Sequence, residues 1–229
     1  MKIHFAVVAV AACCWTSASA SASASVGLCD RGHRQSPIDI RETSRQPLSA
    51  LDFQYVPAAL KLADDGHTVR VRFDKGGVLR IGKERFNLQQ FHFHTPGGDK
   101  IAGEEFPMAA HLLHKSPSGQ LLAVVVLFRT GHENALLNTL IPLIPTHVDG
   151  DHVHPDVSVN ASALLPATRG YFRYPGSVTA PPCTEGVEWV VMKQPLELSA
   201  GQLARYRARF ADNARAVQPL HQRMVRESP

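Results

Sequence analysis

The chain has 229 residues, of which 44% are hydrophobic and 19% are charged. This length fits one large domain or at most two small ones, and this balance is ordinary for a globular protein with a real core. The net charge of +4 is dispersed along the sequence, with no long run of basic residues, so nucleic acid is excluded as an expected partner.

The N-terminal segment is not expected to belong to the fold. A short basic start is followed by an apolar stretch and then by small residues, which is the pattern of a secretory signal peptide. We predict that residues 1–24 are this signal, that residues 25–229 form the domain, and that the mature protein is periplasmic or secreted without a membrane span. Two alternatives stay open: an uncleaved anchor, and a lipoprotein signal in which Cys13 carries the lipid.

Residues 51–128 show mainly strand patterns. The segment 67–73 alternates, so that Val69, Val71 and Phe73 share one face. The stretch 95–105 is expected to be a loop. Further strands are predicted over residues 78–82, 85–94, 106–115 and 121–131. The last of these is almost entirely apolar, which is typical of a central strand covered on both faces.

The second half of the chain mixes helix, loop and strand. The predicted elements are a helix over 133–144 interrupted by Pro142, a polar loop over 146–156, an irregular proline-bounded segment over 171–183, a strand over 187–198 and a helix over 199–210. Ser199 is the candidate N-cap of the last helix, because its hydroxyl can accept from the first free backbone N–H groups.

Two histidines, His92 and His94, lie two residues apart within the predicted strand 85–94. Side chains at i and i+2 project to one face of a strand. The two imidazoles therefore point together, while Phe91 and Phe93 point to a packed core. Adjacent neutral imidazoles suit a divalent metal of borderline softness. Two surface or packed histidines without a metal are the alternative.

A third metal ligand should come from a neighbouring strand. His111 is the best candidate, because a loop long enough for an antiparallel return separates its strand from the first. His114 competes with it, but lies three residues further and therefore on the opposite face, so only one of the two can serve.

Two cysteines, Cys29 and Cys183, remain in the mature chain. In an oxidising compartment two cysteines usually pair, so a disulfide is expected. Two unrelated buried thiols are the alternative.

Six ordered segments together resemble the α-class carbonic anhydrases of the secreted bacterial type: QSPIDI (35–40), DGHTV (65–69), QFHFHTP (90–96), FPMAAHLLH (106–114), YPGSVTAPPCTEGVEW (174–189) and NARAVQPL (213–220). The resemblance covers the chain from about residue 29 to its end. It implies a mainly β (α+β) single domain with few peripheral helices. The central sheet would be twisted, mostly antiparallel and of about ten strands, with a metal at the base of a conical cleft.

The resemblance also implies a zinc enzyme that hydrates CO2 reversibly to bicarbonate and a proton, by attack of a zinc-bound hydroxide. Three neutral imidazoles leave zinc its full charge, so bound water acidifies to a pKa of about 7. A base that titrates near pH 7 must then carry the proton to solvent, which is the property of histidine. The expected partner is this small-molecule substrate, and the protein would be a monomer or homodimer.

Individual roles carry over from the motifs of this family. The implied residues are zinc ligands His92, His94 and His111, the proton shuttle His67, the hydroxide-orienting Thr179, the ligand supports Gln90 and Asn213, and an apolar CO2 pocket of Val178, Trp189 and either Val124 or Ala123. The resemblance likewise implies the disulfide between Cys29 and Cys183.

Three departures from the family pattern lead to a second hypothesis. Gly98 occupies the position of the glutamate that accepts the threonine proton, and Ala109 that of the carboxylate that supports the third ligand. The aromatic segment that usually precedes QSPIDI is absent, so part of the cleft rim should be missing. The alternative function is therefore a catalytically impaired relative that serves as a binding or structural protein.

Overall fold

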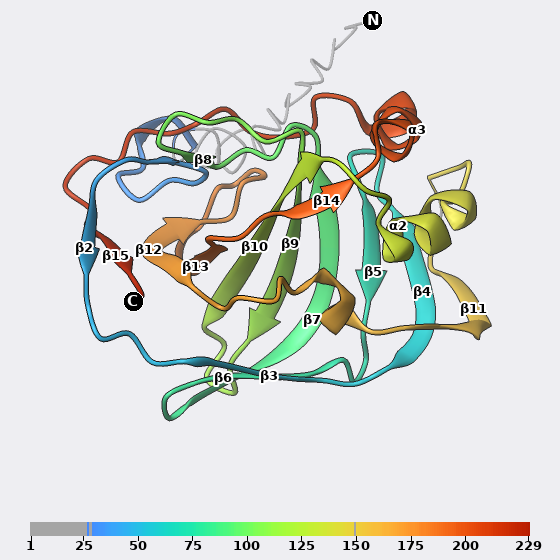
Figure 1. The fold of residues 1–229 in the computed structure, drawn as a ribbon, viewed down its shortest axis with the longest axis horizontal. Helices are drawn as coiled ribbons and strands as arrows, with labels where there is room; N and C mark the ends of the chain where they lie inside the picture. Colours follow the sequence, from blue (N-terminus) through green and yellow to red (C-terminus); the bar gives the residue numbers. More distant parts are fainter. Residues whose placement is uncertain (1–26, 28, 149) are drawn as a thin grey trace, which may run out of the picture.

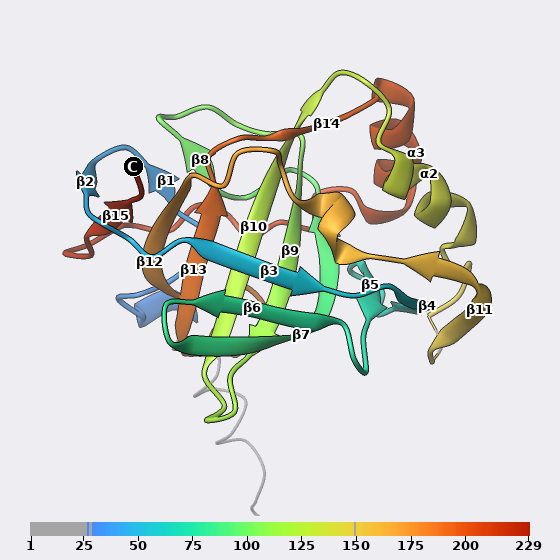
Figure 2. The same cartoon turned by 60° about the horizontal axis from the view of Figure 1, so that its bottom comes forward.

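The computed structural model describes residues 27, 29–148 and 150–229. The predicted signal over 1–24 and Cys13 lie outside the described residues. A large twisted sheet dominates the described part (Figure 1), and the short helices α2 and α3 lie together at one end of it, near β4 and β11 (Figure 2). Within the described residues no helix has both the length and the apolar character needed to cross a membrane.

The elements follow one another along the chain in a strand-rich order. They are β1 (Asp39–Ile40), β2 (Thr43–Arg45), β3 (Leu51–Tyr55), β4 (Ala58–Asp64), β5 (Val69–Arg72), β6 (Gly77–Ile81), β7 (Glu84–His94), β8 (Lys100–Ile101), β9 (Met108–Lys115), β10 (Leu121–Thr130), α2 (Ala135–Leu140), η1 (Ile141–Leu143), β11 (His152–Val159), η2 (Ala161–Leu164), β12 (Tyr171–Ser177), β13 (Glu185–Met192), β14 (Leu196–Leu198), α3 (Ala200–Phe210) and β15 (Val225–Glu227).

The main sheet has 13 strands in the path β11-β4-β5-β7-β9-β10-β13-β12-β15-β2, with β3, β6 and β14 attached to its side. Antiparallel pairing prevails, as predicted, but the sheet is mixed and larger than the expected ten strands. Strand β10 runs parallel to both β13 and β14, and β15 runs parallel to β2. The loop predicted over 95–105 also contributes the two-residue strand β8, which pairs with β1.

Two segments predicted to be irregular are strands. Strand β11 begins inside the predicted loop 146–156, and it lacks an apolar alternation because it is the last strand of the sheet and borders only β4. Strand β12 covers most of the other segment despite Pro175. Its second neighbour, β15, pairs only with Phe172 and Arg173. Because no strand lies on that side of Pro175, its missing N–H costs no bond there.

The predicted C-terminal helix is confirmed as α3. Ser199 accepts a hydrogen bond from the Gln202 backbone, and the Gln202 side chain bonds back to Ser199, forming a capping box. Buried Tyr206 and Phe210 point from this helix to the sheet, where Tyr206 contacts Phe93 edge to face.

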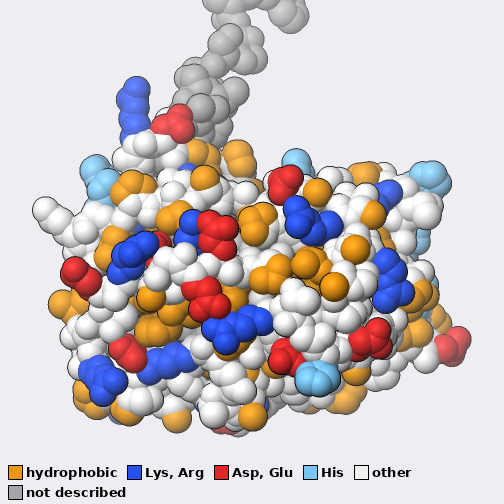
Figure 3. Space-filling view, turned by 45° about the horizontal axis from the view of Figure 1, so that its top comes forward, with side chains coloured by type: hydrophobic (Ala, Val, Ile, Leu, Met, Phe, Trp, Pro, Cys, Tyr) orange, Lys and Arg blue, Asp and Glu red, His pale blue; other side chains and the backbone are white. Residues whose placement is uncertain are grey.

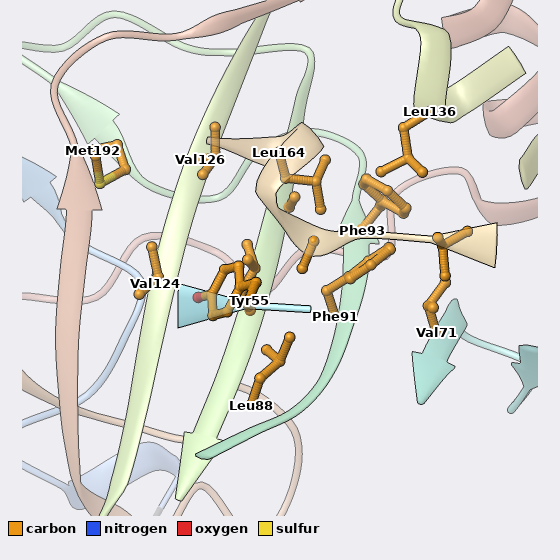
Figure 4. Packing of buried hydrophobic residues seen from close by; sticks show 14 of the residues in the cluster. Tyr55, Val71, Leu88, Phe91, Phe93, Val124, Val126, Leu136, Leu164 and Met192 are labelled. Carbon is orange, nitrogen blue, oxygen red and sulfur yellow. The ribbon is translucent and has the colours of Figure 1, made fainter. Parts of the chain in front are cut away.

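The two faces of the sheet bury separate hydrophobic clusters. Strand β10 contributes to both, as its continuous apolar sequence predicts. Val124, Val126 and Phe128 enter the larger cluster, which also holds Phe91 and Phe93 (Figure 4). The alternate residues Ala123, Val125 and Leu127 enter the smaller cluster around Trp189. Burial of apolar area stabilises a fold by about 25 cal/mol per Å². Because β10 is buried on both faces, it contributes to this stabilisation on both sides of the sheet.

The expected disulfide is present. Cys29 and Cys183 are joined across 154 residues of sequence, so the bond ties the start of the described chain to the loop that follows β12. On the face shown in Figure 3, acidic and basic side chains are interspersed with hydrophobic ones, in keeping with the dispersed charge of the sequence.

Candidate active site

A bulge in β7 decides which way its histidines face. Pairing with β9 shifts register between Leu88 and Gln90, leaving Gln89 as an extra residue. Before the bulge Phe86 and Leu88 are buried, and after it Phe91 and Phe93 are buried, so the buried parity changes by one residue. Gln90, His92 and His94 consequently share the opposite face, where they line a cavity of about 430 Å³.

Strand β9 brings the third histidine to the same place. His111 pairs directly with His92 in the antiparallel register, and its ring lies 5.4 Å from that of His92 and 4.5 Å from that of His94, between centroids. His114 points to the other face, where its Nε2 lies 2.6 Å from the Tyr55 hydroxyl. The three rings His92, His94 and His111 each offer a nitrogen, and these nitrogens lie within 4.8 Å of one another.

Hydrogen bonds fix the tautomers of two of the rings. His94 Nδ1 lies 3.1 Å from the backbone carbonyl of Asn213, and His92 Nδ1 lies 3.0 Å from Oε1 of Gln90. Because both oxygens only accept, each Nδ1 carries the proton and each Nε2 presents a lone pair. The two Nε2 atoms are 3.1 Å apart. Two lone pairs at this distance repel unless a cation lies between them.

Burial keeps these imidazoles in the neutral form that binds metal. Desolvation, reinforced by the neighbouring His94 and Arg70, holds the pKa of His92 well below its ordinary value. Desolvation lowers the pKa of His94 and His111 in the same way. Three buried neutral nitrogens fit zinc, which takes His nitrogens at about 2.0–2.1 Å in tetrahedral sites. The ligand set therefore suits this metal.

The third ligand lacks a partner for its other nitrogen. Nε2 of His111 is buried and has no hydrogen-bond partner among the described residues. Ala109 lies two residues earlier on the same face of β9 and is fully buried, so it provides no acceptor. The ring of Trp189 packs edge to face at 5.1 Å and holds the His111 ring by contact alone.

The cavity has one polar and one apolar wall. Asp65, His67 and Arg70 come from the β4–β5 turn and strand β5, on the polar side. The apolar wall is formed by Leu113, Ala123, Val178, Val187 and Trp189.

Of the two alternatives for the CO2 pocket, Ala123 lines the cavity and Val124 does not. Val124 is fully buried in the larger cluster on the other face of β10 (Figure 4), because successive residues of a strand alternate between faces.

The loop after β12 places Thr179 at the cavity. The backbone N–H of Val178 bonds to the carbonyl of Thr184, that of Cys183 bonds to Ala180, and the disulfide fixes Cys183. Trp189 Nε1 donates to the carbonyl of Ser177, which attaches this loop to the apolar wall. The Thr179 hydroxyl makes no hydrogen bond to any described residue, so the acceptor missing at position 98 is not replaced by another carboxylate.

The region around position 98 differs in backbone as well as in side chain. Gly98 has φ +84, a conformation that side-chain-bearing residues rarely adopt. A Cβ there would contact Pro37 at 3.3 Å. The next residue, Asp99, is buried, and its Oδ1 accepts from the Ile38 backbone and the Tyr174 hydroxyl, while Oδ2 has no partner among the described residues. A glutamate at position 98 would therefore be strained.

Sequence reasoning missed Asp65 and Arg70 as cavity residues. The alternation of 67–73 already placed Arg70 opposite to the buried Val69 and Val71, and in the structure Arg70 pairs across strands with His92. The sequence signal was therefore the parity of β5. The sequence did not show that β5 lies beside β7, the strand that carries His92 and His94.

A carboxylate at position 109 should tighten metal binding. We expect Ala109→Glu to lower the zinc dissociation constant by about 10–100-fold, because it supplies the acceptor that His111 Nε2 lacks. Ala109→Met is the matched control, since it adds similar volume without an acceptor. Transfer of zinc to a chromogenic chelator measures the difference. Release from the glutamate variant as fast as from the methionine variant would contradict the prediction.

Asp99 should make folding stability depend on pH. Burial raises the pKa of Asp99 from an ordinary 3.8 to about 7, against the hydrogen bonds from Ile38 and Tyr174. Between these values the folded state holds a proton that the unfolded state releases, so stability falls as pH rises, by up to about 1.4 kcal/mol per pH unit. Urea unfolding from pH 4 to pH 8 should show that the free energy of unfolding of Asp99→Asn rises relative to that of the wild type until about pH 7. A constant difference would refute this.

Known proteins resemble this chain in sequence and in fold. A family model described as eukaryotic-type carbonic anhydrase matches residues 18–229. A carbonic anhydrase from a Nostoc strain is 37% identical over 208 residues, covering 88% of this chain and 78% of that protein. The structure of the α-carbonic anhydrase of Photobacterium profundum superposes with a TM-score of 0.83 at 36% identity, covering 88% of this chain and 93% of the other.

A second solved structure, the α-carbonic anhydrase of Thermovibrio ammonificans in complex with the inhibitor sulfanilamide, gives a TM-score of 0.84 at 36% identity, over 88% of this chain and 90% of the other. Sequence, fold and the three converging imidazoles agree. The chain belongs to the α-carbonic anhydrases, a family of zinc enzymes, and His92, His94 and His111 form its metal-binding site.

Proposed function

We propose that the protein hydrates CO2 reversibly to bicarbonate and a proton, and that His67 carries the proton between the cavity and solvent. The observation that carries the proposal is the pair of Nε2 lone pairs that face each other at 3.1 Å, with His111 beside them, in the lining of a half-apolar cavity. Such an arrangement is costly without a cation and becomes favourable with one. When bound, zinc supplies a nucleophile at neutral pH, because it lowers the pKa of water to about 7.

The apolar wall is suited to hold CO2. Ala123, Val178, Val187 and Trp189 present no hydrogen-bonding group that would prefer water over this uncharged molecule, apart from the Trp189 Nε1, which is already bonded to Ser177. Thr179 also lines the cavity, where its hydroxyl can accept a hydrogen bond from the attacking water and orient it. Binding and orientation of this kind lower the barrier by fixing the reacting atoms in place.

The proton balance requires a second group. Hydration converts CO2 and water to bicarbonate and releases one proton, which must leave before the next turnover. His67 lines the cavity on its polar side and is exposed, so it can exchange protons with buffer. The disulfide supports a periplasmic or secreted location, since such bonds persist in oxidising compartments.

The second candidate is an impaired relative that binds without catalysis. Two observations favour it: the Thr179 hydroxyl has no acceptor among the described residues, and His111 Nε2 is unpaired. The two missing acceptors leave the Thr179 hydroxyl and the His111 ring less firmly oriented, but neither change removes a metal ligand. Purified protein with stoichiometric zinc that hydrates CO2 no faster than the metal-free chain would support this second function over the first.

Removal of a ligand should abolish both metal and activity. We expect His92→Ala and His94→Ala to lose zinc during dialysis and to reduce CO2 hydration to the background rate. His147→Ala is the matched control, because His147 is exposed and does not line the cavity. Metal analysis with stopped-flow CO2 hydration measures both properties. Full activity in either ligand variant would exclude the proposed site.

Removal of the shuttle should slow only proton release. In weak buffer His67→Ala should reduce kcat by at least about tenfold, toward the roughly 10²–10⁴-fold typical of general acid–base catalysis, and leave kcat/KM unchanged. Added imidazole should restore kcat, because it replaces the missing base. A variant that keeps its kcat in weak buffer, or that imidazole does not rescue, would remove His67 from the mechanism.

A further inference from the structure

The turn between β4 and β5 carries His67 and is held by two adjacent carboxylates. Asp64 is buried, accepts from the Gly66 backbone at 2.7 Å and pairs with Arg209 of α3. Asp65 accepts from the backbone N–H groups of His67 and Thr68 at 3.0 and 2.9 Å, both through Oδ1. Gly66 has φ +84 and allows the chain to reverse between them.

The second oxygen of Asp65 makes a different contact. Oδ2 forms an ion pair with Arg70, whose side chain is 46% exposed and lies on the polar wall of the cavity. Arg70 belongs to β5 and pairs across strands with His92 of β7. One carboxylate therefore connects the backbone of the His67 turn to the strand pair that carries the metal ligands.

The two carboxylates differ in what they can affect. The side chain of Asp64 is fully buried and anchors α3, so its loss would disturb the whole fold. The side chain of Asp65 is 26% exposed, lines the cavity and bonds to His67 itself. Without Asp65 the N–H groups of His67 and Thr68 would turn to water, and the turn would gain conformational freedom.

We propose that Asp65 is a positioning residue for proton transfer: clamped by Arg70, its carboxylate fixes the 65–68 turn so that the His67 imidazole remains at the cavity. This inference rests on the proposed role of His67. Asp65 acts through His67 and is not among the three residues of the metal-binding site. Its removal therefore affects mainly the step that His67 performs. The Asp65 charge also acts on His94 across the cavity, and this effect is lost equally in the alanine and asparagine variants.

The experiment compares kcat and kcat/KM for CO2 hydration by zinc-loaded protein in weak buffer, with and without imidazole. We expect Asp65→Ala to lower kcat by about threefold or more, up to the loss expected for His67→Ala, with kcat/KM unchanged and kcat restored by imidazole. Asp65→Asn should keep more of kcat than Asp65→Ala, because its amide oxygen can still accept from both N–H groups although the ion pair with Arg70 is lost. Asp52→Ala is the control, since among the described residues the Asp52 side chain bonds to Gln54 of the same strand, β3, alone.

A double variant separates positioning from a general structural effect. If Asp65 acts through His67, Asp65→Ala added to His67→Ala causes no further loss of kcat. A further loss, or an equal fall of kcat and kcat/KM in Asp65→Ala, would overturn the inference while leaving the shuttle intact. So would an asparagine variant as slow as the alanine variant. An unaffected His67→Ala would instead refute the proposed shuttle itself.

Discussion

Two imidazole lone pairs directed at one point are the constraint on which this site depends. Each Nε2 faces the other because each Nδ1 is committed to an acceptor, the Gln90 amide or the Asn213 carbonyl. A protonated ring could relieve the repulsion, but burial opposes the charge and lowers the pKa of both histidines. The hydrogen bonds at Nδ1 and the burial of the rings therefore prevent the pair from relieving this repulsion by a change of tautomer or by protonation. Stability spent on this arrangement is recovered when zinc binds.

The same logic explains why the departures from the family pattern do not remove the site. Ala109 and Gly98 lack carboxylates that would orient His111 and Thr179, yet the His111 ring is still enclosed by Trp189 and by its neighbours in the sheet. Packing restrains the position of a ring more than its rotation, and a hydrogen bond restrains both. We therefore expect the two departures to lower the affinity for zinc and the rate of the reaction. The set of ligands is unaffected.

Parity along single strands was readable from the sequence, and the contacts between strands were not. The spacing of His92 and His94, and the three-residue offset of His114 from His111, correctly separated cavity from core. Alternation alone could not reveal the bulge at Gln89, because the extra residue is an ordinary polar one with no turn chemistry of its own.

The misjudged segments failed for similar reasons. Strand β12 contains Pro175 and Gly176, which favour irregular structure locally, but pairing with β13 overrides this preference. Val124 was an alternative to Ala123 for the CO2 pocket because both are apolar, and only the pairing of Ala123 with Trp189 shows which one faces the cavity. The clamp between Asp65 and Arg70 depends on β5 lying beside β7, which is a tertiary fact.

Asn213 joins the two parts of the site in a way that concerns its dynamics. Its backbone carbonyl holds the His94 ring, its Nδ2 donates to the carbonyl of His67, and its Oδ1 accepts from the Thr95 backbone. A displacement of the segment after α3 would therefore shift the metal ligand His94 and the proposed proton carrier His67 together. Because Asn213 contacts both, thermal fluctuations of the segment after α3 carry the His94 ring and the His67 backbone in the same direction, and they change the separation of the two residues less than independent motions would.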